Sequence, residues 1–390
     1  MAEGQPLHPD ADLHGALHGA LHGALHGALD FLRPDSEIGF HRLRDAFAPR
    51  VGFTGPAPVL NVLREIIGAD IGDGEPAFVP IERFPAEAGP ADQTLWIVAD
   101  PVDEAARLQA LRQACPAGRR LAGLGADLLP ALVTWNTDAL TSPPPAPPDT
   151  ITLLLATPRS GSSVVADILG HVTGTRTREH LRKDAIAAMA GGYAIDRAAV
   201  LHRTLRLIGN PATGQATTKI ISHFLQDYVA EVGDLMALKT AARGSAIRVI
   251  ILDRTDHVAQ AVSGYLALNR GVWHRDRTQT GTAADPAGAV DYDFESLLQL
   301  YLFYRQQSSL LAYAREIFPD HLSLEYGADV AAGDVTALGT RIAAFLGQRW
   351  VPDPDATARA KLADAENDRL CAQFRADYRA DYRALFDAAP

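Results

Sequence analysis

The sequence contains very little cysteine. Cys115 and Cys371 are the only cysteines among 390 residues. They are too few and too far apart in the sequence to indicate a disulfide scaffold or a zinc site. This usage is consistent with a reducing compartment, so the cytoplasm is the expected location. Neither cysteine is a credible catalytic nucleophile.

Long apolar runs are also missing. No stretch approaches the roughly 20 consecutive apolar residues that a membrane-spanning helix needs. The N-terminus has no basic segment followed by a continuous apolar core, as a signal peptide would have. We therefore expect no membrane span. The apolar content of 47% is enough for packed cores, and a length of 390 residues predicts two or three domains.

Positive charge is in the minority. The 36 Lys and Arg residues stand against 47 Asp and Glu residues, which gives a formal net charge of −11. This negative balance argues against nonspecific binding to nucleic acid, and we expect no nucleic-acid partner. Any highly anionic ligand must therefore be held by Arg and Lys residues that are gathered locally.

The N-terminus carries a short perfect repeat. The tetrapeptide LHGA occurs four times between Leu13 and Ala28. Four histidines at this spacing could bind a metal ion from one side of a helix. However, each glycine destabilises a helix by about 1 kcal/mol relative to alanine. We interpret residues 1–30 as a low-complexity extension rather than a metal site.

Residues 31–141 mix Gly- and Pro-containing turns with apolar runs. Thr94–Ala99, an amphipathic stretch after it, and Arg120–Leu124 predict a strand, a helix and a second strand. We expect a small accessory α/β domain of unknown role here. The SPPPAPP run within residues 142–149 predicts a stiff linker to a second domain that covers residues 150–390.

The most informative segment is ITLLLATPRSGSSVVADIL, which begins at Ile151. Ile151–Ala156 is a short apolar run typical of a buried strand. Thr157–Ser162 forms a turn with Gly and Ser, and apolar residues at helical spacing follow it. A strand that turns into a helix N-terminus presents backbone N–H groups to a phosphate. The segment predicts a phosphate-bearing ligand, and an ordinary surface turn is the alternative.

This turn has one cation and several hydroxyl groups. The Arg159 guanidinium offers forked donors for phosphate or sulfonate oxygens, and Gly161 lets the backbone approach a ligand closely. Hydroxyl donors are supplied by Ser160, Ser162 and Ser163. The turn lacks the Lys of the GxxxxGK[ST] phosphate loop, which disfavours an ordinary nucleoside-triphosphate site.

A second strand-to-helix turn follows later in the chain. Arg248–Leu252 is another buried-strand candidate, and it leads through Asp253–Asp256 into a helix that contains Ser263. TPRSGSS resembles the loop that binds the 5′-phosphosulfate in sulfotransferases, and DRTDHVAQAVSGYLALNRGVWH resembles their 3′-phosphate segment. This resemblance implies 3′-phosphoadenosine 5′-phosphosulfate (PAPS) as the donor and 3′-phosphoadenosine 5′-phosphate (PAP) as the product.

One branch of these enzymes is the most similar. The step of nine residues from Arg254 to Ser263, followed by the GVWH string that ends at His274, resembles the bacterial trehalose sulfotransferase family. The resemblance implies an α/β fold with a P-loop-type parallel sheet flanked by helices. Since that family includes dimers, a homodimer is also an expectation. Softer similarities lie at Thr218–Ile221, at Tyr292–Tyr313 and in the LSLEYGAD segment.

The resemblance also implies roles for these residues. In sulfuryl transfer the protein mainly positions an in-line acceptor and stabilises charge on the departing phosphate oxygen, and no metal is expected. Arg159 would stabilise the bridging and leaving oxygens. Arg254 and Ser263 would anchor the 3′-phosphate by charge-assisted hydrogen bonds. The acceptor implied is a hydroxyl group of a carbohydrate or glycolipid.

The acceptor hydroxyl needs a general base. The resemblance suggests a glutamate shortly after the first helix, and Glu179 is the acidic residue between Asp167 and Asp184. Thr177 and His180 depart from the family's usual Pro and aromatic residue, which makes His180 the rival base. A histidine suits proton abstraction near neutral pH, whereas a glutamate needs partial burial to become basic enough.

Four more residues are of interest near these motifs. Lys219 on a predicted strand could contact the sulfonate or the acceptor, or it could reach solvent from the strand end. His223 is interpreted as structural. Trp273 and His274 could hold the face of a sugar or adenine, although an ordinary packed tryptophan is an equal alternative.

Two other functions stay open at the level of the sequence. The first is a nucleotide-dependent phosphotransferase, which would need the missing loop lysine and a Mg²⁺ site. The second is a non-catalytic nucleotide-binding protein that has lost its base. Substitution of Glu179 separates the second alternative from an enzyme, because a catalyst would lose turnover and keep its affinity for the nucleotide.

Overall fold

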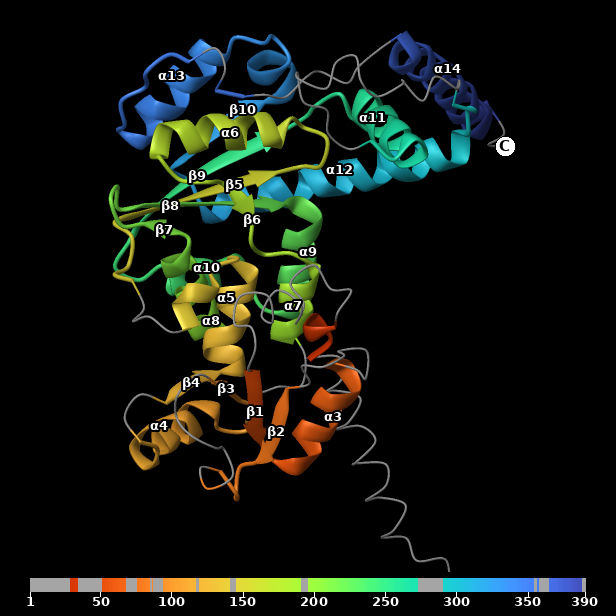
Figure 1. Ribbon diagram of the computed structural model, residues 1–390. Coiled ribbons are helices and arrows are strands. Elements are labelled where there is room, and N and C mark those ends of the chain that lie inside the picture. The colour runs from red at the N-terminus through yellow and green to blue at the C-terminus, as the bar shows by residue number, and fades with distance from the viewer. Residues whose placement is uncertain are drawn as a thin grey trace, which may run out of the picture. The chain divides into compact units, whose positions relative to one another are not determined.

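The computed structural model shows an α/β chain with parallel sheets flanked by helices (Figure 1). It describes residues 29–33, 51–67, 76–84, 86, 94–116, 119–140, 145–190, 196–272, 290–353, 356–357 and 365–387. These residues form two units. Unit 1 takes the described residues of 1–146, 180–208 and 227–243, and unit 2 those of 147–179, 209–226 and 244–390.

Unit 1 is built on a four-stranded parallel sheet in the order β2-β1-β3-β4. Its strands are β1 (Val51–Gly55), β2 (Ala77–Pro80), β3 (Leu95–Val98) and β4 (Arg120–Gly123). Its helical elements are η1 (Asp30–Leu32), α3 (Ala57–Ile67), α4 (Glu104–Ala114), η2 (Leu124–Leu128), α5 (Leu129–Val133), η3 (Thr137–Leu140), α7 (Lys183–Ala190), α8 (Arg197–Leu207) and α10 (Leu235–Ala241). The helix α9 (Ser222–Glu231) is divided between the two units.

The strand, helix and strand expected over residues 94–124 are β3, α4 and β4, so this prediction is confirmed. The helix α4 begins after Asp103, whose carboxylate accepts an N–H hydrogen bond from the first turn. Leu108 and Leu111 of this helix pack with Trp96 of β3 in one apolar cluster. Burial of these side chains holds the helix on the sheet.

The boundary between the units differs from the one expected near residues 149 and 150. Helices α8 and α10 belong to unit 1, although they follow β5 in the chain. On α8, Arg203 forms an ion pair of 3.1 Å with Asp127, and Arg206 Nε donates to the carbonyl oxygen of Pro145 at 2.7 Å. These contacts join residues far apart in sequence, so local patterns could not reveal them.

Unit 2 is built on a six-stranded sheet with the order β10-β9-β5-β8-β6, and β7 pairs with β8 outside this path. Its strands are β5 (Thr150–Ala156), β6 (Arg178–Glu179), β7 (Gly209–Asn210), β8 (Gln215–Ile221), β9 (Ala246–Asp253) and β10 (His321–Glu325). Its helical elements are α6 (Ser162–Thr173), α11 (His257–Arg270), α12 (Phe294–Ile317), η5 (Tyr326–Val330), α13 (Val335–Leu346) and α14 (Ala365–Asp387). All strand pairs are parallel except β7 with β8.

The strands predicted from the apolar runs Ile151–Ala156 and Arg248–Leu252 are β5 and β9, so this prediction is confirmed. The three segments of softer similarity overlap β8, α12 and β10. In the central strand β5 every residue after Thr150 is buried. A strand covered on both faces reads as a continuous apolar run, which explains why the sequence pattern was clear.

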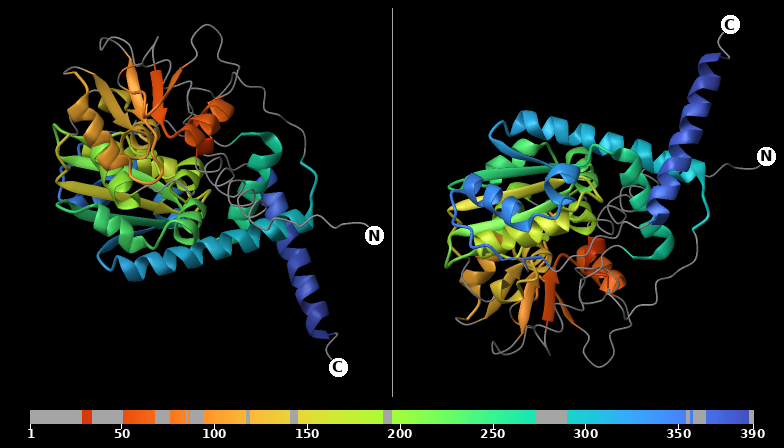
Figure 2. Two further views of the ribbon diagram at one scale, coloured as in Figure 1. Left: turned by 90° about the horizontal axis from the view of Figure 1, so that it is seen from below. Right: turned by 90° about the horizontal axis from the view of Figure 1, so that it is seen from above.

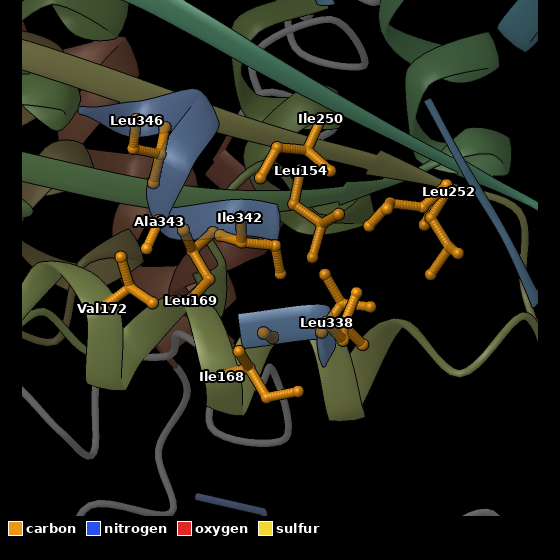
Figure 3. Close-up of a cluster of buried hydrophobic side chains, with 14 of the residues drawn as sticks. Leu154, Ile168, Leu169, Val172, Ile250, Leu252, Leu338, Ile342, Ala343 and Leu346 are labelled. Carbon is orange, nitrogen blue, oxygen red and sulfur yellow. The ribbon is translucent and has the colours of Figure 1, made fainter. Parts of the chain in front are cut away.

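The main core of unit 2 lies between the sheet and two helices. Figure 3 shows Leu154 of β5 and Ile250 of β9 facing Leu169 of α6 and Ile342 of α13. Each of these four side chains is fully buried. Figure 1 shows α6 and α13 on this side of the sheet and α12 along its other side. The sheet is therefore covered on both faces.

The strand order creates a switch point between β5 and β9. From β5 the chain continues through α6 to β6 on one side of the sheet, and from β9 it continues through α11 and α12 to β10 on the other side. In open parallel sheets, ligands bind beyond the carboxyl ends of the strands at such a point. The turns after β5 and β9 therefore lie where a ligand site is expected in unit 2.

The C-terminal helix α14 packs on unit 2 through one side. Its residues Leu370 and Phe374 are buried against Val262 of α11 and Leu297 of α12. Figure 2 shows α14 beside α11 at the end of the long helix α12. No helix in the described ranges is both long and apolar enough to cross a membrane.

We predict that Leu154→Ala lowers the free energy of unfolding of unit 2 by about 2–5 kcal/mol, because it leaves a cavity in the core. The matched control is Leu302→Ala on α12, where the side chain is 53% exposed. This control should change stability by less than about 0.5 kcal/mol. Equilibrium urea unfolding measures both variants, and equal losses would contradict the assignment of this core.

Candidate functional site

The turn after β5 has a left-handed backbone at two positions. The φ angles are 59° at Arg159 and 78° at Gly161, which caps the N-terminus of α6. A left-handed conformation costs a residue with a side chain about 1–2 kcal/mol, so Arg159 must be held in place by its surroundings. At Gly161 a Cβ atom would lie 2.8 Å from Val330 Cγ1 and 3.1 Å from Tyr326 Cδ2. Only glycine fits there.

Hydrogen bonds to the turn itself keep this shape. The fully buried Gln260 of α11 donates from Nε2 to Thr157 Oγ1 at 3.0 Å and to the carbonyl oxygen of Pro158 at 2.5 Å. Ser160 Oγ donates to the carbonyl oxygen of Thr157 at 2.6 Å. The Ser160 hydroxyl proton is therefore used within the turn, and this residue shapes the loop instead of offering its proton to a ligand.

Ser162 and Ser163 occupy the first two positions of α6. Ser162 is buried, and Ser163 is partly buried. The N-terminus of a helix carries partial positive charge and N–H groups without a partner inside the helix. These two residues therefore stay candidates for contact with an anion, as the sequence predicted.

The turns after β5 and β9 meet through their arginines. Arg254 Nη1 donates to the carbonyl oxygen of Arg159 at 3.0 Å. Arg159 Nε in turn donates to Ser263 Oγ on α11 at 3.2 Å. The structure therefore brings together Arg159, Arg254 and Ser263, which the sequence analysis selected from segments far apart in the chain.

The two guanidinium groups are like charges in a partly buried place. Burial lowers the pKa of Arg159, and the charge of Arg254 lowers that pKa further. Burial also lowers the pKa of Arg254, whose Nε has no hydrogen-bond partner. Arginine stays protonated in proteins, so both charges persist. The charges of Asp256 and Glu325 act to raise the pKa of Arg254. Two neighbouring guanidiniums that are partly removed from water still form a centre of positive charge that is suited to an anion.

Two tyrosines surround the arginines. The Arg254 guanidinium lies over the ring of Tyr326, 4.4 Å from its centroid, as in a cation–π contact. The buried Tyr304 of α12 approaches Gly264 so closely that a Cβ atom there would lie 2.3 Å from Tyr304 Oη. Burial raises the pKa of Tyr304, although Arg159 and Arg254 act to lower it. The Tyr304 hydroxyl is therefore protonated near neutral pH and lies within electrostatic reach of both guanidiniums.

Two carboxylates near the site accept hydrogen bonds from the turn after β9 and from neighbouring helices. Asp253 Oδ1 accepts from the N–H of Arg254 and from Ser308 Oγ, both at 2.8 Å. Glu325 accepts from Thr255 Oγ1 at 3.1 Å and from the N–H of Ala328 at 2.7 Å. Burial raises the pKa of Glu325, but these hydrogen bonds lower it by more. Both carboxylates thus fix the backbone around Arg254.

The candidate base and the candidate lysine form an ion pair. Glu179 on β6 lies opposite Lys219 on β8, and Lys219 Nζ is 2.9 Å from Glu179 Oε1. The Glu179 side chain is 25% exposed, and the Lys219 side chain is 11% exposed. On its other side Lys219 pairs with Leu154 of β5, and Leu154 lies two residues before the end of that strand. The alternative of a lysine that extends into solvent is therefore wrong.

Of the four remaining predicted residues, the structure describes His180 and His223. His180 is buried in unit 1, so it is not among the side chains that unit 2 brings together. His223 follows β8, and its ring centroid lies 4.0 Å from that of Phe224. Trp273 and His274 lie outside the described residues, as does the LHGA repeat. Their predicted roles stay predictions.

Sequence reasoning missed three residues of the site. Tyr326 directly follows β10, and its position at the carboxyl end of a parallel strand was a signal that could have found it. Gln260 and Tyr304 lie within helices, where only tertiary packing decides which side chain faces the turn. No local pattern distinguishes them from other helical residues.

The site therefore offers a helix N-terminus, two partly buried guanidiniums and a carboxylate–amine pair on the neighbouring strands β6 and β8. This set is suited to a ligand with more than one anionic group and to proton abstraction beside it. In the part of the chain that the structure describes, no group of three or more His, Cys, Asp or Glu residues could hold a metal ion.

No protein-family model matches the sequence, and no curated protein matches it.

We predict that Gly161→Ala weakens the binding of inorganic pyrophosphate at least about tenfold, because the new Cβ atom pushes Tyr326 and Val330 out of place. The matched control is Gly347→Ala at the end of α13, where φ is 64° and nothing lies within 4 Å of a Cβ atom. Both variants should lose about 1–2 kcal/mol of stability through backbone strain. Calorimetric titration tests the difference, and equal affinities in the two variants would refute it.

Proposed function

We propose that this chain is a sulfotransferase that moves a sulfuryl group from PAPS to a hydroxyl group of a carbohydrate or glycolipid. The observation that carries the proposal is the pair of partly buried guanidiniums, Arg159 and Arg254, at the switch point of a parallel sheet. They come from the two turns that resemble the 5′- and 3′-phosphate segments of sulfotransferases. A P-loop-type sheet is part of the same proposal.

The residues at this site fit a nucleotide with two separate anionic groups. The N–H groups of the turn and of the α6 N-terminus would hold the 5′-phosphate, with Arg159 beside it. Arg254 and Ser263 would hold the 3′-phosphate. Ser263 Oγ accepts its hydrogen bond from Arg159 and so keeps its own proton for a phosphate oxygen. Arg254 still has the unpartnered Nε as a donor.

The chemistry needs one base and one centre of positive charge. When bound, PAPS supplies a sulfuryl group whose bond to the 5′-phosphate oxygen breaks as the bond to the acceptor oxygen forms. Glu179 takes the proton of the acceptor hydroxyl, and Lys219 orients the Glu179 carboxylate through their 2.9 Å ion pair. Arg159 stabilises the negative charge that develops on the leaving oxygen.

A phosphotransferase is less well supported by the same residues. Its phosphate loop would need a lysine, and the turn from Thr157 to Ser162 has none. Lys219 does not replace it, since its amine is paired with Glu179. The non-catalytic alternative keeps the anion site and differs in the role of Glu179. A homodimer and a cytoplasmic location remain predictions from the sequence.

The test is sulfuryl transfer from labelled PAPS to a panel of mono- and disaccharides that includes trehalose. We expect Glu179→Gln to lower turnover by about 10²–10⁴-fold, the usual contribution of a general base, with PAP affinity within about threefold of the wild type. The control is Glu366→Gln, which removes a carboxylate of similar exposure (18%) from an ion pair with Arg369 on α14. It should not change turnover.

Two outcomes would count against this account. Absence of transfer by the wild-type protein to every acceptor, together with absence of PAP binding, would contradict the sulfotransferase proposal. Full turnover in Glu179→Gln would contradict the role of Glu179 and make His180 the next base to test.

A further inference from the structure

Unit 2 contains a chain of four threonine hydroxyl groups beside the Glu179–Lys219 pair. Its members come from the end of α6, the segment before β6, and β8. Three of them are buried, and the fourth is partly buried. In order along the hydrogen bonds they are Thr177, Thr217, Thr175 and Thr173.

The hydrogen bonds of this threonine chain all run in one direction. Thr173 Oγ1 donates to the carbonyl oxygen of Leu169 at 2.8 Å. A hydroxyl group has one proton, so Thr175 must be the donor in its 2.8 Å bond to Thr173. By the same reasoning Thr217 donates to Thr175 at 2.6 Å. Thr177 donates to Thr217 at 2.8 Å, and the chain therefore ends on a backbone carbonyl.

The threonine chain begins directly beside the ion pair. Glu179 of β6 is opposite Lys219 of β8. Two residues earlier on each segment, Thr177 is hydrogen-bonded to Thr217. Because side chains alternate between the faces of a sheet, residues two apart share a face. The Thr177–Thr217 pair is thus the neighbour of the Glu179–Lys219 pair on the same face.

The strand that carries Glu179 is short. β6 consists of two residues, Arg178 and Glu179. Besides the backbone pairing with β8, a hydrogen bond of 3.3 Å from Thr218 Oγ1 to the carbonyl oxygen of Arg178 supports it. At its other end the threonine chain is anchored on α6, the helix whose N-terminus forms the anion-binding turn. The chain therefore connects this helix to the segment of the candidate base.

We propose that Thr175, Thr177 and Thr217 are positioning residues. They hold Glu179 against Lys219 and at a fixed position relative to α6. A proton relay does not explain the arrangement, since the chain ends on an amide carbonyl that does not take up a proton. Buried hydroxyl chains that are fully satisfied fix their members in place. The inference rests on the proposed function for the role of Glu179, whereas the positioning itself can be measured without it.

The fold supplies a closely matched control. Thr152 of β5 is the register neighbour of Thr217, and both side chains are fully buried. The Thr152 hydroxyl has no hydrogen-bond partner. Replacement of threonine by valine keeps the shape and removes the hydroxyl group. Thr217→Val therefore interrupts the chain, whereas Thr152→Val makes the same chemical change in the same environment without breaking a hydrogen bond.

The first test measures how firmly Lys219 is held. The full chain is treated with acetic anhydride, and the rate of acetylation of Lys219 is followed by peptide mass spectrometry. We expect Thr217→Val to accelerate this rate about fivefold or more, because the lost hydrogen bonds loosen β6. Thr217→Ser, which keeps the hydroxyl group, and Thr152→Val should stay within about twofold of the wild type. Equal rates in Thr217→Val and Thr152→Val would overturn the proposal.

The second test asks whether the positioning acts through Glu179. Thr217→Val should lower sulfuryl transfer from PAPS to the saccharide panel about tenfold, with PAP affinity within about twofold. In a Glu179→Gln background the same substitution should cause no further loss, whereas multiplied losses would mean a general structural effect. If the wild type neither binds PAP nor transfers, the proposed function fails, and the Lys219 rates still decide the positioning.

Discussion

The close approach of two like charges is the constraint on which the candidate site of unit 2 depends. Arg159 and Arg254 lie just beyond the ends of neighbouring central strands, and both are partly buried. Asp256 and Glu325 partly offset the charge of Arg254, and the backbone around the two arginines is held by other groups. Gln260 and Asp253 supply that support through hydrogen bonds to the two turns. The fold thus maintains a positive centre that an anionic ligand would neutralise.

The helix α6 connects this centre with the rest of the site. Its N-terminus follows the turn of Arg159. Its last residue, Thr173, anchors the threonine chain on the carbonyl oxygen of Leu169. A rigid helix therefore fixes the spacing between the turn that is proposed to bind an anion and the strand of Glu179. In-line transfer requires just such a fixed relation between donor and base, because small misplacements are costly in rate.

The sequence predicted the parts of unit 2 that depend on local patterns. The apolar run of β5 and the turn around Gly161 were clear because a buried parallel strand and a left-handed turn each demand particular residue types. It did not predict Gln260 or Tyr304, whose roles arise from helix packing. It also assigned α8 to the second domain, since the ion pair of Arg203 with Asp127 joins distant segments.

The most direct measurement of the central claim is a calorimetric titration with PAP beside ATP, on the wild type and on Arg254→Ala. The control is Arg305→Ala, an exposed arginine that also lies over a tyrosine ring, 5.8 Å from its centroid. The account predicts that PAP binds more tightly than ATP, that Arg254→Ala abolishes this binding, and that Arg305→Ala retains it. A preference for ATP with Mg²⁺, or PAP binding that persists in Arg254→Ala, would contradict it.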